Sequence, residues 1–391
     1  MAGLNPYTPG AGTKPRLLAG RAAQVALVRS LADQVAAGRE ANPMIYTGLR
    51  GVGKTSLLYE SRDALRERGW LAGYYEVRRE VEPGAAIRSI IQDSAELSTG
   101  RLRRALASGA HSIGGMKLHL GPAGFSFEVD TTAGATTSDD PYPELVSFLR
   151  RVSHDAKANG AGVALLIDEL QVFRTRDLAV LVQALSALKA EPIALIGAGL
   201  PYLASQMSKA NTYAERFRYE QIDRLSDSDA RLAIAEPALD QGTVWQEDAL
   251  ARLLDLADGY PYFLQLYASE AWVVAGDAAA ITRTHVDAAV DPVRRQLDAG
   301  LFAARYDRLS ERERDYVDAM VTVMDAAATP SNRVGSGPVA DVLGATQGAL
   351  GPVRDRIIRK GIIHSPTYGV LEFSVPGFSD YVRRRSRAVG L

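Results

Sequence analysis

Residues 48–55 read Gly-Leu-Arg-Gly-Val-Gly-Lys-Thr, which fits the pattern Gly-x4-Gly-Lys-[Ser/Thr]. Glycine tolerates the backbone angles that let successive N–H groups point inward at phosphate oxygens. From the composition of this chain, the pattern would arise by chance about 0.007 times. An apolar strand is expected just before it, over 43–47, and a helix just after it, over 55–68. The stretch therefore predicts a phosphate-binding loop that holds a nucleoside triphosphate with magnesium at a helix N-terminus.

Two side chains of this loop have specific chemical roles. The Lys54 ammonium is expected to reach the β- and γ-phosphates, and the Thr55 hydroxyl is expected to ligate magnesium. The residues expected to bind the nucleotide here are Gly48, Leu49, Arg50, Gly51, Val52, Gly53, Lys54, Thr55 and Ser56.

A carboxylate is needed beside the Thr55 hydroxyl to hold the metal, and the run Val-Ala-Leu-Leu-Ile-Asp-Glu at 163–169 supplies it. The apolar residues predict a buried strand with Asp168 at its carboxyl end, where the carboxylate can hold magnesium through water. Glu169 follows directly and is placed to orient the attacking water as a general base. Two alternatives are a strand that merely ends in a solvated acidic turn, and a Glu169 that pairs with a basic side chain.

Strands and helices alternate through the first 224 residues, which predicts an α/β fold with a parallel sheet. We expect the parallel-sheet core of a P-loop NTPase, then a helical lid and a winged helix-turn-helix. The expected boundaries are an extended arm at 1–17, the core at 18–224, the lid at 225–300 and the winged-helix domain at 306–391. Within the core, 109–140 reads as a β-hairpin and linker insertion.

Composition narrows the classes of function. The 391 residues include no cysteine, which excludes disulfides, thiolate zinc sites and cysteine nucleophiles. No apolar run approaches the ~18 residues that span a bilayer, so we expect no membrane partner and a cytoplasmic location. Net charge is −1, yet 331–391 carries nine Lys or Arg against four Asp or Glu. A basic end on a neutral protein suggests a nucleic-acid footprint or a solvated tail.

The segment 346–360 predicts a recognition helix for duplex DNA. Its cations are Arg354, Arg356, Arg359 and Lys360, and the last three share one face at spacings of three and four. The Tyr368-Gly369 turn would form the wing. Winged helices also bind proteins, and a basic helix face is often only solvated, so both alternatives stay open.

Four motifs, in order, resemble those of the AAA+ and STAND branches of P-loop ATPases. They are Gly20-Arg21, the loop at 48–55, Leu-Leu-Ile-Asp-Glu at 165–169, and Gly-Tyr-Pro-Tyr-Phe-Leu-Gln at 259–265. The chain looks most like bacterial and archaeal ATPases related to origin-recognition initiators, over nearly all of 18–388.

The resemblance implies that Gly20 and Arg21 line the adenine pocket and that Pro261 approaches the base. From the residues alone, Pro261 reads equally well as the first residue of a helix.

Two departures from that family concern hydrolysis. The strand that usually ends in a polar sensor residue reads Ile-Ala-Leu-Ile-Gly-Ala-Gly over 193–199, and the lid turn lacks its usual arginine. Slow turnover, or an arginine from a neighbouring subunit of a homo-oligomer, is therefore expected. Arg216 and Arg218 are the candidates for that arginine; the alternative is a solvated loop with an internal pair to Glu215.

Three functional hypotheses follow. The first is an AAA+-like switch that binds ATP and magnesium, hydrolyses ATP by water attack on the γ-phosphate, and contacts duplex DNA through the winged helix. The second is a STAND-type regulatory ATPase in which ATP/ADP exchange controls association with a protein partner. The third is an ATP-binding protein with little turnover.

Overall fold

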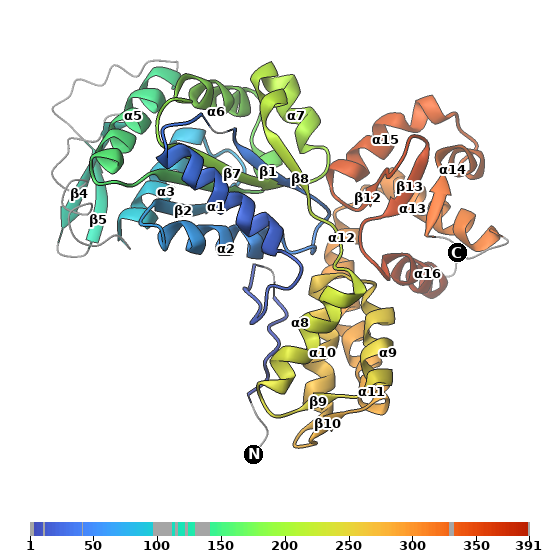
Figure 1. Ribbon diagram of the computed structural model, residues 1–391. Helices are drawn as coiled ribbons and strands as arrows, with labels where there is room; N and C mark the ends of the chain where they lie inside the picture. The colour runs from blue at the N-terminus through green and yellow to red at the C-terminus, as the bar shows by residue number, and fades with distance from the viewer. Residues whose placement is uncertain are drawn as a thin grey trace. The chain divides into compact units, whose positions relative to one another are not determined.

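The computed structural model describes residues 4–10, 12–40, 42–96, 112–113, 116–121, 124–129, 141–327 and 332–389. The chain divides into two compact units (Figure 1). The core unit comprises 20–48 and 53–222, and the second unit comprises 1–19, 49–52 and 223–391.

The core unit is built on a five-stranded parallel sheet, which confirms the predicted fold class. Strand order is β2–β6–β7–β1–β8, from Leu71–Glu76, Val163–Asp168, Ile193–Gly199, Met44–Thr47 and Arg218–Gln221. Because every strand runs the same way, the carboxyl ends of β1, β6 and β7 meet at one edge, next to the glycine loop.

Helices cover the two faces of this sheet, as the continuous apolar strands require. Alternate residues of β6 divide between the faces, with Val163, Leu165 and Ile167 in the core formed with α3, α5 and α6. The other face packs against α2, on which α1 lies. The helices span Ala22–Ala36 (α1), Lys54–Arg66 (α2), Pro83–Glu96 (α3), Tyr142–Ala158 (α5), Thr175–Ala187 (α6) and Leu203–Ala210 (α7).

The predicted hairpin is present, with β4 (Met116–Gly121) antiparallel to β5 (Gly124–Val129). A further strand, β3 (Ser112–Ile113), pairs with β4. The predicted linker at 130–140 and the predicted continuation of α3 to 108 lie outside the described residues.

In the second unit, four helices form a helical module: α8 (Asp227–Leu239), α9 (Glu247–Ala257), α10 (Pro261–Ala275) and α11 (Arg283–Leu297). Two short strands, β9 (Val244–Trp245) and β10 (Ala280–Ile281), pair beside them. The N-terminal arm packs on this module through Tyr7, whose ring meets those of Trp245 and Trp272 edge-on. The arm, which the sequence predicts to be extended, is therefore anchored on the helical module.

The rest of the second unit is a C-terminal module, which begins with a π-helical turn over Asp298–Phe302 and α12 (Ala303–Asp307). Its order is then α13 (Glu311–Ala326), β11 (Arg333–Gly335), α14 (Ser336–Val342), α15 (Gln347–Arg359), β12 (Ile363–His364), β13 (Val370–Phe373) and α16 (Phe378–Val389). The three strands form an antiparallel sheet in the order β11–β13–β12. Three helices followed by a hairpin are consistent with the predicted winged helix-turn-helix.

Several elements were not predicted, among them α7, β11 and α16. The strand β11 and the helix α7 are short, and α16 has four arginines between 383 and 387, so its sequence resembles a solvated tail. Tertiary packing explains the helix, because the Phe378 and Tyr381 rings pack against Phe302 of the π-helical turn, and Phe378 also meets Phe373 of β13. No described helix is long and apolar enough to cross a membrane.

Candidate nucleotide site

The glycine loop has the backbone that its sequence predicts. Gly51 and Gly53 have φ of 86° and 91°, a region that costs other residues about 1–2 kcal/mol. Helix α2 begins directly after them at Lys54. The Lys54 ammonium is buried, with 6 % of the residue exposed, and donates a hydrogen bond to the Gly48 carbonyl at 2.9 Å. A buried cation at a helix N-terminus fits an anionic ligand such as a triphosphate.

Thr55 and Asp168 meet at the carboxyl end of β6. The Thr55 hydroxyl donates to Asp168 Oδ2 at 2.6 Å, and the other carboxylate oxygen accepts the Glu169 N–H at 2.8 Å. Asp168 is 2 % exposed. A hydroxyl and a carboxylate are hard oxygen donors, which magnesium prefers, so these two residues fit the predicted metal site.

Tyr74 is a residue of this site that the sequence did not reveal. It lies on β2, next to β6, and its hydroxyl donates to Asp168 Oδ2 at 3.3 Å. Burial, together with the Asp168 charge, raises the pKa of the Tyr74 hydroxyl, which therefore remains a protonated donor. Its ring packs against Tyr59 of α2 at a centroid distance of 4.6 Å. The alternating pattern at 70–77 indicates a strand, but the pairing of β2 with β6 is needed to place this hydroxyl.

Glu169 follows Asp168 in an unusual backbone conformation. Its φ of 53° is left-handed, so the chain turns sharply from β6 into a 3-10 turn over Leu170–Val172. The Glu169 carboxylate accepts a hydrogen bond from Gln171 Nε2 at 2.5 Å. The partner of Glu169 in this contact is a neutral amide.

The candidates for adenine recognition lie in different units. Gly20 (φ of 68°) and the buried Arg21 precede α1 in the core unit. Pro261 is the first residue of α10 in the second unit, and the loop residues 49–52 also group with that unit. Thr55 and Ser56 occupy the first turn of α2.

The two candidate arginine fingers have local partners. The Arg216 guanidinium lies over the Tyr213 ring at 5.8 Å, and Arg218 pairs with Glu220 at 2.6 Å. Both contacts involve residues other than Glu215, which the sequence suggested.

Two of the four DNA-contact candidates are held by one buried carboxylate of α13. Arg356 and Lys360 pair with Glu313 at 3.2 and 2.5 Å, and Glu313 is 1 % exposed. Burial alone would raise the pKa of Glu313, but the hydrogen bonds from Lys360 and Ser310 lower it overall. Arg354 lies 3.8 Å from Asp355, and Arg359 is exposed.

The C-terminal arginines of α16 also have acidic partners. Arg383 pairs with Asp325 and Asp380, and Arg384 pairs with Asp298 at 2.6 Å. Two of these three acids lie before residue 331, so the predicted charge excess at 331–391 omitted them.

Comparison with protein families gives two matches. Residues 17–196 match the family described as AAA ATPase domain, and residues 299–382 match one described as a domain of unknown function (DUF8462). No curated protein matches the chain in sequence.

Solved structures of three proteins are similar to this chain to different degrees. The Walker-type ATPase PABY2304 of Pyrococcus abyssi is similar with a TM-score of 0.64 and 14 % identity, over 96 % of this chain and 98 % of that one. Orc1 of Aeropyrum pernix, in complex with DNA, has a TM-score of 0.45 and 12 % identity over 96 % and 95 % of the two chains. The RuvB Holliday junction branch migration motor of Thermotoga maritima has a TM-score of 0.44 and 13 % identity over 94 % of this chain and 92 % of that one.

Proposed function

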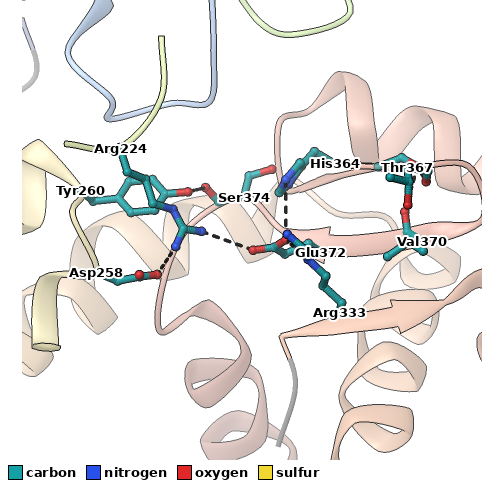
Figure 2. A network of polar contacts seen from close by, with 10 residues as sticks. Arg224, Asp258, Tyr260, Arg333, His364, Thr367, Val370, Glu372 and Ser374 are labelled. Carbon is teal, nitrogen blue, oxygen red and sulfur yellow. Dashed lines mark hydrogen bonds and ion pairs between the residues drawn. The ribbon is translucent and has the colours of Figure 1, made fainter. Parts of the chain in front are cut away.

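We propose that this chain, a P-loop ATPase whose residues 17–196 match the AAA ATPase domain, works as a nucleotide-controlled switch with the C-terminal module as its output. The observation that carries the proposal is a polar network that joins the Asp258–Pro261 turn to the sheet of the C-terminal module (Figure 2).

In this proposal the core residues have distinct roles in hydrolysis. The bound nucleotide supplies the electrophilic γ-phosphoryl group, and magnesium adds positive charge beside it. Lys54 compensates phosphate charge, and Thr55 and Asp168 hold the metal. Glu169 orients water and accepts its proton. Replacing Glu169 by Gln retains the shape of the side chain and removes the base.

Arg224 is the centre of the network. It donates to Asp258 and to Glu372 of β13, at 3.3 Å from the latter, and its guanidinium lies over the Tyr260 ring at 4.7 Å. The Tyr260 hydroxyl donates to the Ser374 carbonyl at 3.0 Å, which makes a second link to the same strand end. Figure 2 shows Arg224 between the turn and β13, and Glu372 between Arg224 and Arg333.

The turn itself has little freedom to move alone. Gly259 has φ of 67°, and a Cβ there would meet the Leu225 carbonyl oxygen at 2.7 Å. Leu225 N–H also donates to the Gly259 carbonyl at 2.8 Å. A nucleotide that displaces Pro261, the last residue of this turn, would therefore also shift β13.

For the output we propose a protein partner, as in the STAND hypothesis, in preference to duplex DNA. Residues 299–391 carry thirteen Lys or Arg against ten Asp or Glu, a balance of only +3. The cations at 356, 360, 383 and 384 contact carboxylates of the same unit. Affinity for DNA depends on Lys and Arg side chains that neutralise phosphates and so release the counterions condensed on the DNA. Because four of the cations already contact carboxylates, this module offers little for DNA.

Hydrogen exchange in ATP and in ADP tests the switch. We expect amides at 258–260 and 370–375 to differ together between the two nucleotides, and Arg224→Ala to abolish the difference at 370–375. Arg252→Ala is the matched control, because Arg252 pairs within the helical module, with Asp255 and Asp287. Identical exchange in ATP and ADP at both segments would refute the switch.

Fluorescence anisotropy with a labelled 30-base-pair duplex tests the output. We expect no binding tighter than the non-specific range of about 10⁻⁴–10⁻⁶ M. Tighter, salt-dependent binding that Arg354→Ala and Arg359→Ala weaken would favour the DNA hypothesis instead.

A further inference from the structure

Gly199, the last residue of β7, has no side chain, and the Gln171 side chain occupies the space beside it. A Cβ at Gly199 would lie 2.5 Å from Gln171 Oε1 and 2.6 Å from Leu203 Cδ2. Gly199 pairs with Thr47, and its carbonyl accepts the Gly48 N–H at 3.2 Å. The Gln171 amide therefore lies at the strand end next to the glycine loop, where the strand has no polar side chain of its own.

Both the nitrogen and the oxygen of the Gln171 amide form hydrogen bonds. Its Nε2 donates to Glu169 Oε2, and its Oε1 accepts the Leu200 N–H at 3.1 Å. The Leu200 contact fixes the oxygen on one side, so the NH₂ group must face the carboxylate. The amide thus connects Glu169 to the junction of β7 and α7.

The turn that carries Gln171 is itself held in place. Gln206 of α7 donates through Nε2 to the Phe173 carbonyl at 3.2 Å and to the Gln171 carbonyl at 3.4 Å. Leu170, which precedes Gln171, packs against a second glycine of β7, Gly197. A Cβ at Gly197 would lie 2.3 Å from Leu170 Cδ1. Two glycines of β7 therefore accommodate two consecutive residues of the turn after β6.

We propose that Gln171 is a positioning residue for hydrolysis, which holds the Glu169 carboxylate in place. From the turn after β6, its amide takes the place of the polar side chain that β7 lacks at its end. The inference rests on the proposed role of Glu169. A carboxylate held by one directed hydrogen bond samples fewer orientations, so water is aligned more often. Loss of the Gln171 amide affects turnover and spares nucleotide binding, because Gln171 contacts Glu169 and the α7 junction.

The first experiment measures kcat and KM for ATP, with affinity for a fluorescent ATP analogue and thermal melting as controls. For Gln171→Leu and Gln171→Glu we expect kcat about 10- to 100-fold lower, with KM and analogue affinity within twofold. Gln171→Glu has nearly the same shape and cannot donate to Glu169. An unchanged or raised kcat in both variants would overturn the proposal.

A rescue variant separates positioning from packing. Gly199→Asn in the Gln171→Ala background places an amide in the vacated space at the end of β7, and we expect kcat to recover at least threefold over Gln171→Ala alone. Gly199→Ala with Gln171 intact should lower kcat, because its Cβ displaces the amide. Failure of both expectations would show that the amide position is irrelevant.

A double-mutant cycle distinguishes this proposal from the role of Glu169. We expect Glu169→Gln/Gln171→Leu to be no slower than Glu169→Gln. If Glu169→Gln retains kcat, the proposed base is wrong and the inference falls with it. If Glu169→Gln abolishes turnover and Gln171→Leu does not change it, only the inference about Gln171 fails.

Discussion

Tyr7→Phe isolates the hydrogen bonds that anchor the N-terminal arm on the helical module. The Tyr7 hydroxyl donates to the Ile234 carbonyl and accepts from Trp245 Nε1, both at 2.7 Å. Tyr7 is 4 % exposed, and burial raises the pKa of its hydroxyl, so it stays protonated in the folded state. Phenylalanine keeps the ring contacts with Trp245 and Trp272 and removes both hydrogen bonds.

The expected loss follows from those two contacts. Each buried group left without its partner costs about 1–2 kcal/mol, so the free energy of opening of the helical module should fall by about 2–4 kcal/mol. Hydrogen exchange of α8 and α10 amides measures that local free energy without assuming that the whole chain unfolds together.

Tyr368→Phe is the control, since Tyr368 is fully exposed. It should change the opening free energy by less than about 0.5 kcal/mol. A change that small for Tyr7→Phe as well would refute the reasoning, because it would mean that the arm contributes nothing to the module. Loss of protection throughout the core sheet would also contradict a local role.

Three further predictions concern stability and metal use. Gly259→Ala combines a left-handed φ with a contact of 2.7 Å to the Leu225 carbonyl, and should lower the melting temperature by a few degrees, for a cost of about 2–4 kcal/mol. Glu313 has a lowered pKa when folded, so its contribution to stability is present above pH 4.5 and lost as pH falls through the folded value. Glu313→Gln should therefore flatten the loss of helicity between pH 5 and 3, and parallel curves for the two proteins would contradict this. Tyr74→Phe removes a donor from the proposed metal carboxylate and should raise the magnesium concentration for half-maximal ATPase activity about 10-fold; an unchanged value would show that the contact is incidental.

The strands and the glycine loop were predictable because their signals are local. A run of apolar residues such as 163–167 is typical of a strand buried on both faces of a parallel sheet, and three glycines before a Lys-Thr pair are typical of a phosphate-binding loop. The residues that complete the site were not predictable in this way. Tyr74 and Gln171 reach Asp168 and Glu169 through the pairing of β2 with β6 and the turn after β6, which depend on tertiary packing.

The charge of the C-terminal module shows a different limit of sequence reading. Counting residues 331–391 alone suggested a basic surface, but Glu313, Asp325 and Asp298 come from earlier helices. Helical spacing correctly placed 356 and 360 on one face of α15, and did not reveal that this face meets a buried carboxylate. Charge that is near in sequence is a poor guide to charge that is near in space.

The anchored arm also has a consequence for synthesis of the chain. The ribosome makes Tyr7 long before Trp245, its partner on the helical module. At ~5–20 residues per second, that interval is about 12–48 s. During this time the Tyr7 ring lacks its native contacts, while the core sheet, which lies between Tyr7 and Trp245 in the sequence, can already fold. Conditions that slow translation would thus lengthen the exposure of an N-terminal apolar segment, and a helical module expressed without residues 4–19 would have an uncovered apolar surface.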